Sequence, residues 1–530
     1  MRQKGDDIPV SAMSVDGVIP TGTAKLEKRG IAPRVPKWNS ETCAQCGVCA
    51  SACPHAAIRT KLVEPADAEK APASFTMVDA KPNDHGEKFK VQVYCDDCTG
   101  CGVCLDQCPM NKIPGKEALV WSTIEAEKEA GEKENEVFFN ELPDNVMGKN
   151  TTKTIKGAML RTPLFEFSGA CAGCGETPYV KLVSQLFGEN AIVANATGCS
   201  SIYSGTFPTI PYTTNKEGRG PAWANSLFED NAEFGFGMRL AVDQNRDTLK
   251  TYVEKVLACA EAPADLREAL EGAMAHFDNS KTEEAVAAQN KAKEVLAKYA
   301  DKDCADLAKV RELQDYFTDK SVWIIGGDGW ANDIGYGGID HVLAQGQNVN
   351  ILVLDTEVYS NTGGQASKST PTGAVAKFAT GGKRTYKKNM GLMSMSYGYV
   401  YVASVALGAD RMQTLKAFQE AEAYNGPSII FAYAPCIAHG IDMSKTQTEQ
   451  KRAVEAGYFP LYRYNPDNEV PFTWDAKDPK GSYQDFIRSE GRYKSLLKTN
   501  PEAAEDLYQQ AEKDAAQRMS VYKAVGELMR

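Results

Sequence analysis

Cysteine spacing constrains this 530-residue chain more than any other feature, because all but three of its fifteen cysteines fall into three sets of four. Two sets are compact runs with the spacing C-x2-C-x2-C-x3-C-P, formed by Cys43, Cys46, Cys49 and Cys53 before Pro54 and by Cys98, Cys101, Cys104 and Cys108 before Pro109. The other set is dispersed and consists of Cys171, Cys174, Cys199 and Cys436. Such spacing is typical of iron–sulfur proteins. We expect three [4Fe–4S] clusters that form an electron-transfer chain.

The compact runs indicate a bacterial-type two-cluster ferredoxin fold, in which the fourth cysteine of each run ligates the other cluster. This rule predicts one cluster on Cys43, Cys46, Cys49 and Cys108, and another on Cys53, Cys98, Cys101 and Cys104. A zinc site needs two pairs of ligands and leaves the regular triplets unexplained. Cys95 adds a further C-x-x-C register three residues before Cys98, but we expect it to be an unligated neighbour.

Composition excludes several classes of function. The net charge of −11 argues against a nucleic-acid or anionic-membrane surface. No apolar run approaches the ~20 residues of a spanning helix, and the N-terminal MRQKGDDIPVSAM lacks the apolar core of a secretory signal. Without an export signal, this many cysteines indicate a reducing compartment, where thiolates bind metal rather than pair. We therefore expect a cytoplasmic protein without nucleic-acid or membrane partners.

Length and patterning predict more than one domain. The expected order is an extended lead-in segment (1–40), a small α+β ferredoxin-like domain (41–125), an exposed linker (126–155), an α/β domain (156–480) with a helical insertion (241–315), and a helical tail (481–530). Within the ferredoxin-like domain, a strand pair is expected from Ser74 to Val78 and from Phe89 to Tyr94.

The C-terminal half alternates apolar strands with helices. The expected strands are 191–198, 322–329, 350–357 and 428–435, and the helical stretches between them include 334–346 and 396–426. Each expected strand ends in polar, Gly or Pro residues. Buried apolar strands separated by helices predict a mostly parallel, doubly wound sheet.

Chemistry-bearing residues follow these strands. Cys199 and Cys436 come directly after two of them, and Gly327-Asp328-Gly329 and Asp355-Thr356-Glu357 end two others. Because ligands collect at the carboxyl ends of the strands, these residues are expected to meet at one edge. A strand that runs into G-D-G and is followed by polar ligands indicates magnesium and thiamine diphosphate: glycines let backbone amides approach the diphosphate, and the Asp supplies a hard oxygen ligand.

Alternatives stay open for single residues. On its own G-D-G is common in ordinary strand-to-helix loops, and the segment S-N-T-G-G-Q at 360–365 together with the converging cysteines favours the cofactor site. Cys259 and Cys304 are expected to pack between helices rather than to bind metal. His439 lies near the expected site, where a structural role is at least as well supported as proton transfer. No ligand spacing is found at His55, His85, His276 and His341.

Four segments carry a family resemblance: GDGWANDIGYGGIDHVL, LDTEVYSNTGGQASKSTPTGAVAKF, GRGPAWANSLFEDNAEFGFGM and CPHAAIR. The chain resembles the C-terminal part of pyruvate:ferredoxin (flavodoxin) oxidoreductase over nearly its whole length, namely the two-cluster ferredoxin domain and the thiamine-diphosphate domain. The resemblance implies an α/β doubly wound domain that binds thiamine diphosphate, preceded by a small α+β two-[4Fe–4S] ferredoxin domain.

The resemblance also implies residue roles. A proximal [4Fe–4S] cluster would be held by Cys171, Cys174, Cys199 and Cys436. Mg2+ would be held by the Asp328 carboxylate, Thr356 and the Val358 carbonyl. The residues expected to contact the cofactor are Glu176, Gly327, Asp328, Gly329, Trp330, Thr356, Glu357, Val358, Tyr359, Ser360 and Asn361, of which Glu176 and Asn361 are the expected catalytic residues. Thr356 stands where the commoner thiamine signature has Asn.

The implied reaction is oxidative decarboxylation of a 2-oxoacid, most simply pyruvate, with coenzyme A to acyl-CoA and CO2. Electrons would pass through the three clusters to ferredoxin or flavodoxin. The family's pyrimidine-binding and coenzyme A domains match no part of this chain, so we expect half of the cofactor site, completed by a partner subunit or chain segment in an oligomer. The chain would be a split subunit or a fragment. Alternatives are another 2-oxoacid:ferredoxin oxidoreductase, an electron-transfer subunit, or a redox-neutral thiamine enzyme.

Overall fold

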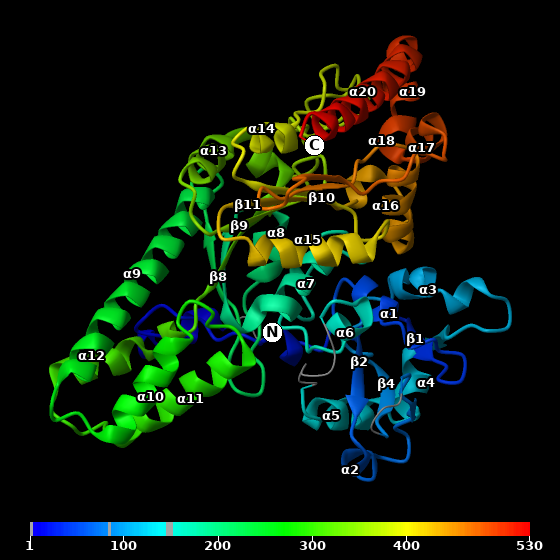
Figure 1. The fold of residues 1–530 in the computed structure, drawn as a ribbon. Coiled ribbons are helices and arrows are strands. Elements are labelled where there is room, and N and C mark those ends of the chain that lie inside the picture. The colour runs from blue at the N-terminus through cyan, green and yellow to red at the C-terminus, as the bar shows by residue number, and fades with distance from the viewer. Residues whose placement is uncertain (1–3, 83–85, 145–151, 530) are drawn as a thin grey trace.

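The computed structural model describes residues 4–82, 86–144 and 152–529. Figure 1 shows a small domain built on the two cysteine runs (blue to cyan) beside a larger α/β domain, from which a long helical arm (green) extends. The predicted fold class is confirmed, because a small domain with two antiparallel sheets precedes a mostly parallel α/β sheet. No helix in the described ranges is long and apolar enough to cross a membrane.

The small domain places one short helix inside each cysteine run. Helix α1 (Val48–Ala52) follows Gly47 at φ 73°, and α3 (Val103–Gln107) follows Gly102 at φ 80°, a left-handed conformation that glycine adopts without strain. Two antiparallel sheets support them: β1 (Arg34–Trp38) with β5 (Leu119–Thr123), and β2 (Ile58–Val63), β4 (Lys88–Val93) and β3 (Val78–Asp79) in the order β2-β4-β3. Strand β1 lies within the segment expected as an extended lead-in.

Two expectations for this region were wrong. The strand expected from Ser74 to Val78 is reduced to Val78–Asp79, and β4 pairs mainly with β2. The segment expected as an exposed linker is largely helical: α4 (Ile124–Glu129), α5 (Glu132–Glu141) and α6 (Ile155–Met159). The charged surface of α5 hides an inner side on which Phe139 is buried in the core of the small domain.

The larger domain contains an eight-stranded sheet in the order β13-β12-β10-β11-β9-β8-β6-β7. Its strands are β6 (Ala191–Ala196), β7 (Ala222–Ser226), β8 (Ser321–Gly327), β9 (Asn350–Asp355), β10 (Tyr401–Val405), β11 (Ser428–Tyr433), β12 (Tyr462–Tyr464) and β13 (Phe472–Trp474). The strands from β10 to β7 are parallel, and β12 and β13 are antiparallel. The four predicted strands are confirmed as β6, β8, β9 and β11.

The stretch 396–426 was wrongly expected to be all helix, because strand β10 occupies its first part. The β-branched and aromatic residues at 400–405 suit a buried central strand. Helix α15 (Arg411–Ala423) is capped by Asp410, whose side chain accepts a hydrogen bond from the Gln413 amide at 2.8 Å.

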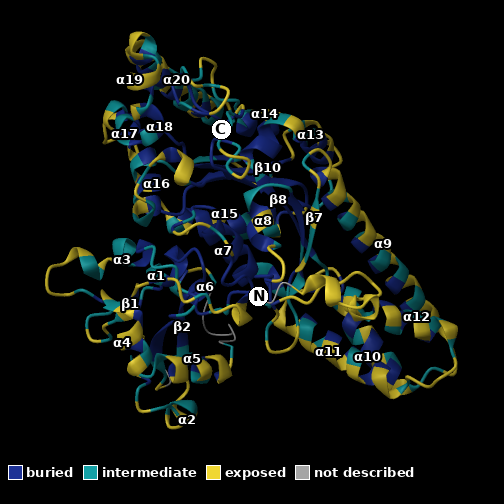
Figure 2. Ribbon diagram, turned by 180° about the vertical axis from the view of Figure 1, so that it is seen from behind, coloured by how far each residue is buried: buried dark blue, intermediate teal, exposed yellow. Residues whose placement is uncertain are grey.

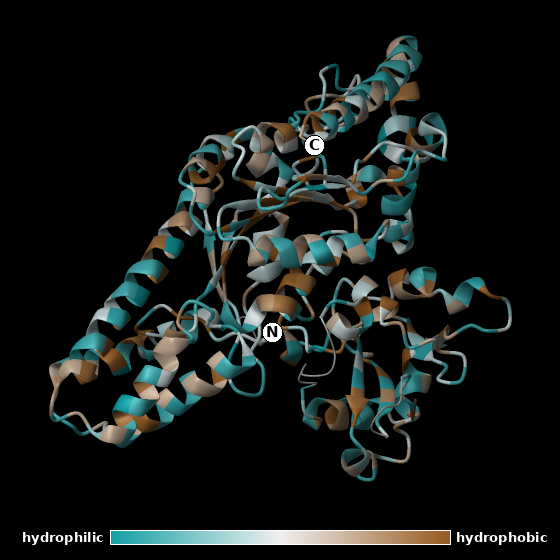
Figure 3. Ribbon diagram, in the orientation of Figure 1, coloured by the Kyte–Doolittle hydropathy of each residue, from teal (hydrophilic) through white to brown (hydrophobic). Residues whose placement is uncertain are grey.

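Successive side chains of each strand point to opposite faces of the sheet, so the sheet has a hydrophobic core on each face. Val193, Trp323 and Leu352 pack with α7 (Thr177–Phe187) and α15. Residues one position along, such as Ala194 and Ile324, pack on the other face with α13 (Tyr336–Ala344), α14 (Met390–Met395) and α20 (Pro501–Leu528). Figures 2 and 3 show this sheet as the buried, hydrophobic centre of the molecule.

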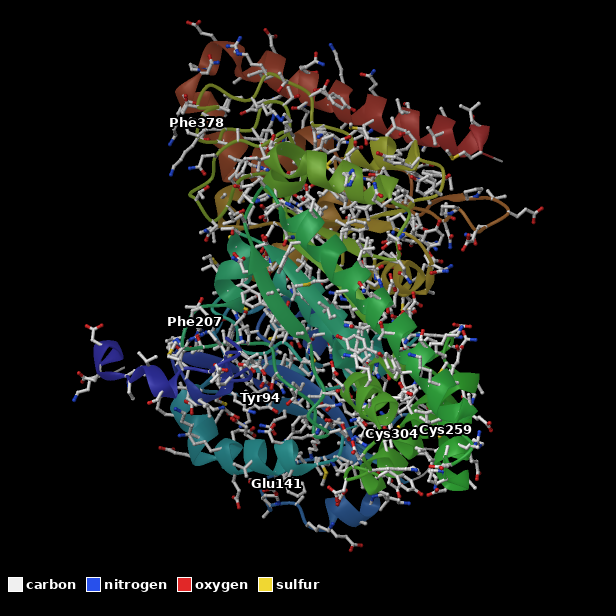
Figure 4. All side chains as sticks on the ribbon, turned by 90° about the vertical axis from the view of Figure 1, so that its left-hand side faces the viewer. Tyr94, Glu141, Phe207, Cys259, Cys304 and Phe378 are labelled. Atoms are coloured by element: carbon white, nitrogen blue, oxygen red, sulfur yellow. The ribbon has the colours of Figure 1, made fainter. Side chains whose placement is uncertain are left out.

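The helical arm comprises α9 (Asn231–Ala258), α10 (Ala264–Ala275), α11 (Glu283–Lys298) and α12 (Ala305–Leu313), so it begins before the expected residue 241. Its helices share a core of their own, with Cys304 at the edge. Cys259 is exposed, so the expectation that it packs between helices was wrong. Figure 4 labels both cysteines on the arm. The C-terminal segment adds α17 (Tyr483–Ser489), α18 (Gly491–Lys494), α19 (Leu496–Thr499) and α20.

Candidate cluster and cofactor sites

The structure brings the compact-run cysteines together in the crossed combination that the spacing predicts. Cys43, Cys46, Cys49 and Cys108, the first set, line one cavity. Cys53, Cys98, Cys101 and Cys104, the second set, line another. Burial raises the pKa of the Cys49 thiol, and the neighbouring thiols of Cys43, Cys46 and Cys108 raise it further. Cys95 lines neither cavity, and its Sγ lies 4.0 Å from the Val93 carbonyl oxygen.

Across residues 4–82, 86–144 and 152–529, no three His, Cys, Asp or Glu side chains lie close enough to hold one metal ion. A [4Fe–4S] cluster takes one thiolate on each iron, so its four sulfurs surround a larger volume than the ligands of a single ion. The two cysteine-lined cavities suit that donor set.

The dispersed set, Cys171, Cys174, Cys199 and Cys436, converges although its members are remote in sequence. Burial raises the pKa of the Cys199 thiol, and Glu176 and the other three cysteines of the set raise it further by their proximity. Cys199 begins α8 (Cys199–Ser204) directly after β6, and Cys436 follows β11. The Cys171–Cys174 turn fits closely: a Cβ at Gly173 would lie 2.3 Å from the Met443 carbonyl oxygen.

A third cavity, here called the cofactor cavity, adjoins the dispersed set at the carboxyl ends of β6, β8 and β9. Predicted cofactor residues that line it are Glu176, Gly327, Gly329, Trp330, Thr356, Val358, Tyr359, Ser360 and Asn361. Thr197, Gly198, Cys199, Phe228 and Thr362 also line it. Gly329 must be a glycine, since a Cβ there would lie 2.6 Å from the Tyr359 ring. A Cβ at Gly198 would meet no atom within 4 Å, which leaves room beside it.

The Thr356 hydroxyl lies within hydrogen-bond distance of the other two oxygens predicted to hold Mg2+. The Thr356 hydroxyl is 3.0 Å from Asp328 Oδ1 and 3.0 Å from the Val358 carbonyl oxygen. The Ser367 hydroxyl donates to Asp328 Oδ2 at 2.6 Å. Asp328 is fully buried, and burial together with the neighbouring Asp355 carboxylate raises its pKa well above the usual value. A cation at this position would relieve that cost.

Glu357 lies in the predicted loop, but its side chain points away from the cavity. Oε1 accepts from Lys387 Nζ at 2.7 Å, and Oε2 accepts from Tyr458 at 2.6 Å and Arg492 at 2.8 Å. Despite burial, these cations hold its pKa well below the usual range. Its φ of 60° is unusual for a non-glycine residue. Glu357 therefore anchors the loop rather than facing a ligand.

Sequence reasoning missed the partners of this loop. Lys387 also donates to Asp355 Oδ2 at 2.7 Å, and Arg492 donates to Glu490 Oε2 at 2.6 Å. These residues come from a loop before α14 and from α18, and they follow Glu357 by 30 and 135 residues in the sequence. No local pattern marks them, because each acts through a long-range contact.

Glu176 is a buried carboxyl group with an oxygen that is free to accept a hydrogen bond from a ligand. Its side chain is buried, and its Oε2 has no hydrogen-bond partner. Burial raises its pKa to about 7. Because a buried polar atom without a partner is costly, an incoming ligand that donates to Glu176 would be stabilised here.

The cofactor cavity and the dispersed set share residues. Cys199 lines the cavity, and the Ser360 hydroxyl lies 3.7 Å from Cys436 Sγ. His439 is fully buried and accepts a hydrogen bond from the Cys436 amide at Nδ1, 3.1 Å away. It lies behind the cysteine rather than in the cavity. His55 is buried beside the second set, His276 and His341 lie outside these cavities, and His85 lies outside the described residues.

The fold and the cavities define the class: an iron–sulfur protein with a thiamine-type α/β domain. Comparison with known families agrees. Residues 42–111 match the family described as "4Fe-4S double cluster binding domain", and residues 308–432 match "Thiamine pyrophosphate enzyme, C-terminal TPP binding domain". Residues 1–32 match a family described as "EKR: Domain of unknown function".

Individual relatives carry the name of the family that the sequence resembles. The chain is 55% identical over 99% of its length to "Pyruvate:ferredoxin oxidoreductase" of Moorella thermoacetica, covering 45% of that protein. It is 49% identical over 99% of its length to "Pyruvate-flavodoxin oxidoreductase" of Trichormus variabilis, covering 44%. The resemblance is confirmed: the chain is homologous to part of these oxidoreductases and spans less than half their length.

Proposed function

We propose that the chain carries the electron relay and the diphosphate half of the thiamine site of a pyruvate:ferredoxin or pyruvate:flavodoxin oxidoreductase. The reaction would be oxidative decarboxylation of pyruvate with coenzyme A to acetyl-CoA and CO2. One observation carries this proposal: the cofactor cavity and the dispersed cysteine set share an edge, with Ser360 Oγ 3.7 Å from Cys436 Sγ. Electrons leaving a substrate bound in the cavity would reach a cluster there without crossing the protein.

A third [4Fe–4S] cluster on the dispersed set is supported by the donor chemistry. Four thiols with no disulfide partner converge beside the cavity, and thiols of this kind ionise when a metal binds. The proposed ligands are Cys171, Cys174, Cys199 and Cys436.

Mg2+ on Asp328, Thr356 and Val358 is supported by oxygen spacing. An octahedral ion with ligands at about 2.1 Å separates adjacent ligands by about 3 Å. The Thr356 hydroxyl lies 3.0 Å from each of the other two oxygens, which fits that separation. The bound thiamine diphosphate would supply the electron sink for decarboxylation. Asp328 and Thr356 would hold its diphosphate through the metal, and Glu176 and Asn361 would contact the cofactor from the cavity wall.

The order of the relay is supported by one contact between the sets. Burial raises the pKa of the Cys101 thiol, and the Gly173 backbone amide opposes that rise from close by. Gly173 lies between Cys171 and Cys174, so the dispersed set adjoins the second set. We therefore propose that electrons pass from the dispersed set to the second set, then to the first set, and finally to ferredoxin or flavodoxin.

A partner that completes the site is supported by exposed apolar residues that neighbour the site residues in sequence. Ile202, Leu227 and Ile437 are 52%, 59% and 64% exposed, and each lies within three residues of Cys199, Phe228 or Cys436. Exposed apolar side chains gathered round a site indicate an interface. The pyrimidine-binding and coenzyme A-binding parts would dock here from another subunit or chain segment. Phe207 and Phe378, labelled in Figure 4, are exposed as well.

The test uses the assembled enzyme, with the chain and the polypeptide that completes it. Pyruvate added without an acceptor should bleach cluster absorbance and produce the EPR signal of reduced [4Fe–4S] clusters, and ferredoxin should restore the absorbance. Both changes should require thiamine diphosphate and Mg2+. An equal concentration of 2-oxoglutarate serves as the substrate control. Release of CO2 from pyruvate with no cluster reduction would contradict the proposal and favour a redox-neutral enzyme.

A further inference from the structure

Lys181 is a buried cation at the junction of the two domains. It lies on α7 and is only 2% exposed. Its Nζ donates to three carbonyl oxygens at the end of α1, those of Ala50, Ser51 (3.1 Å) and Cys53 (2.7 Å). An ammonium group has three protons, so all of them go to backbone oxygens. The charge itself is therefore left without a bonded carboxylate.

The charges that act on Lys181 come from cysteines of both predicted cluster sets, although both cysteines lie in the first compact run. Burial lowers the pKa of Lys181 to about 8, whereas the thiolates of Cys53 and Cys49 favour its charged form and Arg59 opposes it. Cys53 belongs to the second set and Cys49 to the first set. Lys181 thus lies close to both cluster cavities, and Cys53 of the second set affects its pKa more than Cys49 of the first set does.

Among the residues that the structure describes, the second cysteine run has no buried lysine in the position that Lys181 occupies beside the first run. Helix α3 corresponds to α1, and Lys112, near its end, has a 60% exposed side chain that pairs with Asp106 at 3.6 Å. In the described ranges, no buried lysine donates to the last carbonyls of α3. The two halves of the ferredoxin domain repeat the same cysteine spacing but differ in this buried charge.

Capping the end of α1 does not require a charge. The neutral Gln447 side chain already donates to the Ala52 carbonyl oxygen at 3.5 Å, at the same helix end. Burying an ammonium group without a carboxylate is costly, so another negative partner is expected. Reduced iron–sulfur clusters with thiolate ligands supply such a charge.

We propose that Lys181 is an internal counter-ion that raises the reduction potentials of the two ferredoxin-type clusters, and that of the second set more than that of the first. The inference rests on the proposed function, because it requires both clusters. Reduction adds one electron to an anionic cluster, so a fixed positive charge nearby stabilises the reduced form, most strongly in a low-dielectric interior. Lys181 would be a positioning residue for the relay: it makes the second cluster a better electron acceptor for the dispersed set.

The test is an EPR-monitored redox titration of the assembled enzyme in the absence of pyruvate and thiamine diphosphate. Lys181→Met, which removes the charge, should shift the potential of the second cluster downward, that of the first cluster less, and that of the dispersed set least. Lys181→Arg should restore values near wild type. Gln447→Met is the matched control, since it removes a neutral donor from the same helix end and should leave all potentials in place.

Each outcome decides the proposal. Unchanged potentials in Lys181→Met at full iron content would overturn it, and so would equal shifts in Lys181→Met and Gln447→Met. Failure of every variant at position 181 to load clusters would assign Lys181 to holding the junction together and would also overturn it. A wild-type protein that titrates three clusters but does not oxidise pyruvate would contradict the proposed function alone, because the titration needs no substrate.

Discussion

The compact cysteine runs and the dispersed set are held in place by different means. In the runs, glycines in left-handed turns and short helices α1 and α3 position the sulfurs within a few residues of chain. In the dispersed set, Cys199 and Cys436 stand at the ends of two strands of the eight-stranded sheet. The first arrangement is local and the second depends on a whole domain. Changes to the α/β domain should therefore separate the two.

Cys436→Ser gives the largest expected effect on this comparison. Loss of one thiolate should remove the dispersed-set cluster and abolish pyruvate-dependent turnover, because the relay loses its entry point. The compact-run clusters should remain, so iron analysis and EPR should show the loss of one cluster of three. Cys95→Ser is the control and should lose no iron, as its thiol lies outside both cavities. An unchanged EPR spectrum of reduced Cys436→Ser would contradict the ligand assignment.

Arg492→Met should weaken the fold around the cofactor loop. It leaves the buried carboxylates of Glu357 and Glu490 without the guanidinium that bonds both of them. Removing one partner of a buried ion pair costs about 3–5 kcal/mol. Denaturant titration should detect this loss, with the dispersed-set cluster lost before the other two.

The control for that change is Arg488→Met, four residues earlier on the neighbouring helix. Its pair with Glu505 is exposed at 37% and 61%, so the expected cost is at most about 1 kcal/mol. Equal destabilisation by the two substitutions would show that the buried network does not hold the loop.

These contacts explain which features of the structure could be predicted from the sequence and which could not. The cysteine spacing and the four apolar strands were predictable, because both depend on neighbours in sequence. Strand β10 was missed because only five residues, among them Gly408 and the capping Asp410, separate its apolar run from α15, and α5 was missed because charges on its outer face conceal Phe139. The anchors of the cofactor loop, Lys387 and Arg492, could not be predicted, since they meet Glu357 only after the sheet and C-terminal helices have packed.

Asp328→Asn should separate metal binding from folding. The carboxylate is costly to bury without a cation, so the amide should leave the stability of the metal-free protein unchanged or raise it. Binding of Mg2+ and thiamine diphosphate to the assembled enzyme should weaken at least about 100-fold, or about 3 kcal/mol. Calorimetric titration measures the binding, and iron content should stay at the wild-type level. Loss of iron would contradict the separation between this site and the clusters.

Lys61→Met should produce the smallest effect, confined to the ferredoxin domain. Lys61 Nζ donates to the Phe139 and Leu142 carbonyls, at 3.3 and 2.9 Å, and its closest carboxylate, Asp144, is 3.8 Å away. Burial lowers its pKa to about 8 from an ordinary 10.5. Between these values the unfolded chain binds more protons than the folded one, so Lys61 makes the protein more stable as the pH rises.

Below pH 8 both states are protonated and the cost of burying the charge is present in full. Lys61→Met removes this dependence, so its stability relative to wild type should fall by roughly 2 kcal/mol between pH 8 and 10.5. Anaerobic denaturant titrations across this range measure the difference. Lys88→Met, at a 41% exposed side chain paired with Asp79, is the control and should show no such trend. If the stability difference between Lys61→Met and wild type did not change with pH, Lys61 would be solvated or paired in solution. The charge of a buried lysine in this domain would then be balanced without the clusters.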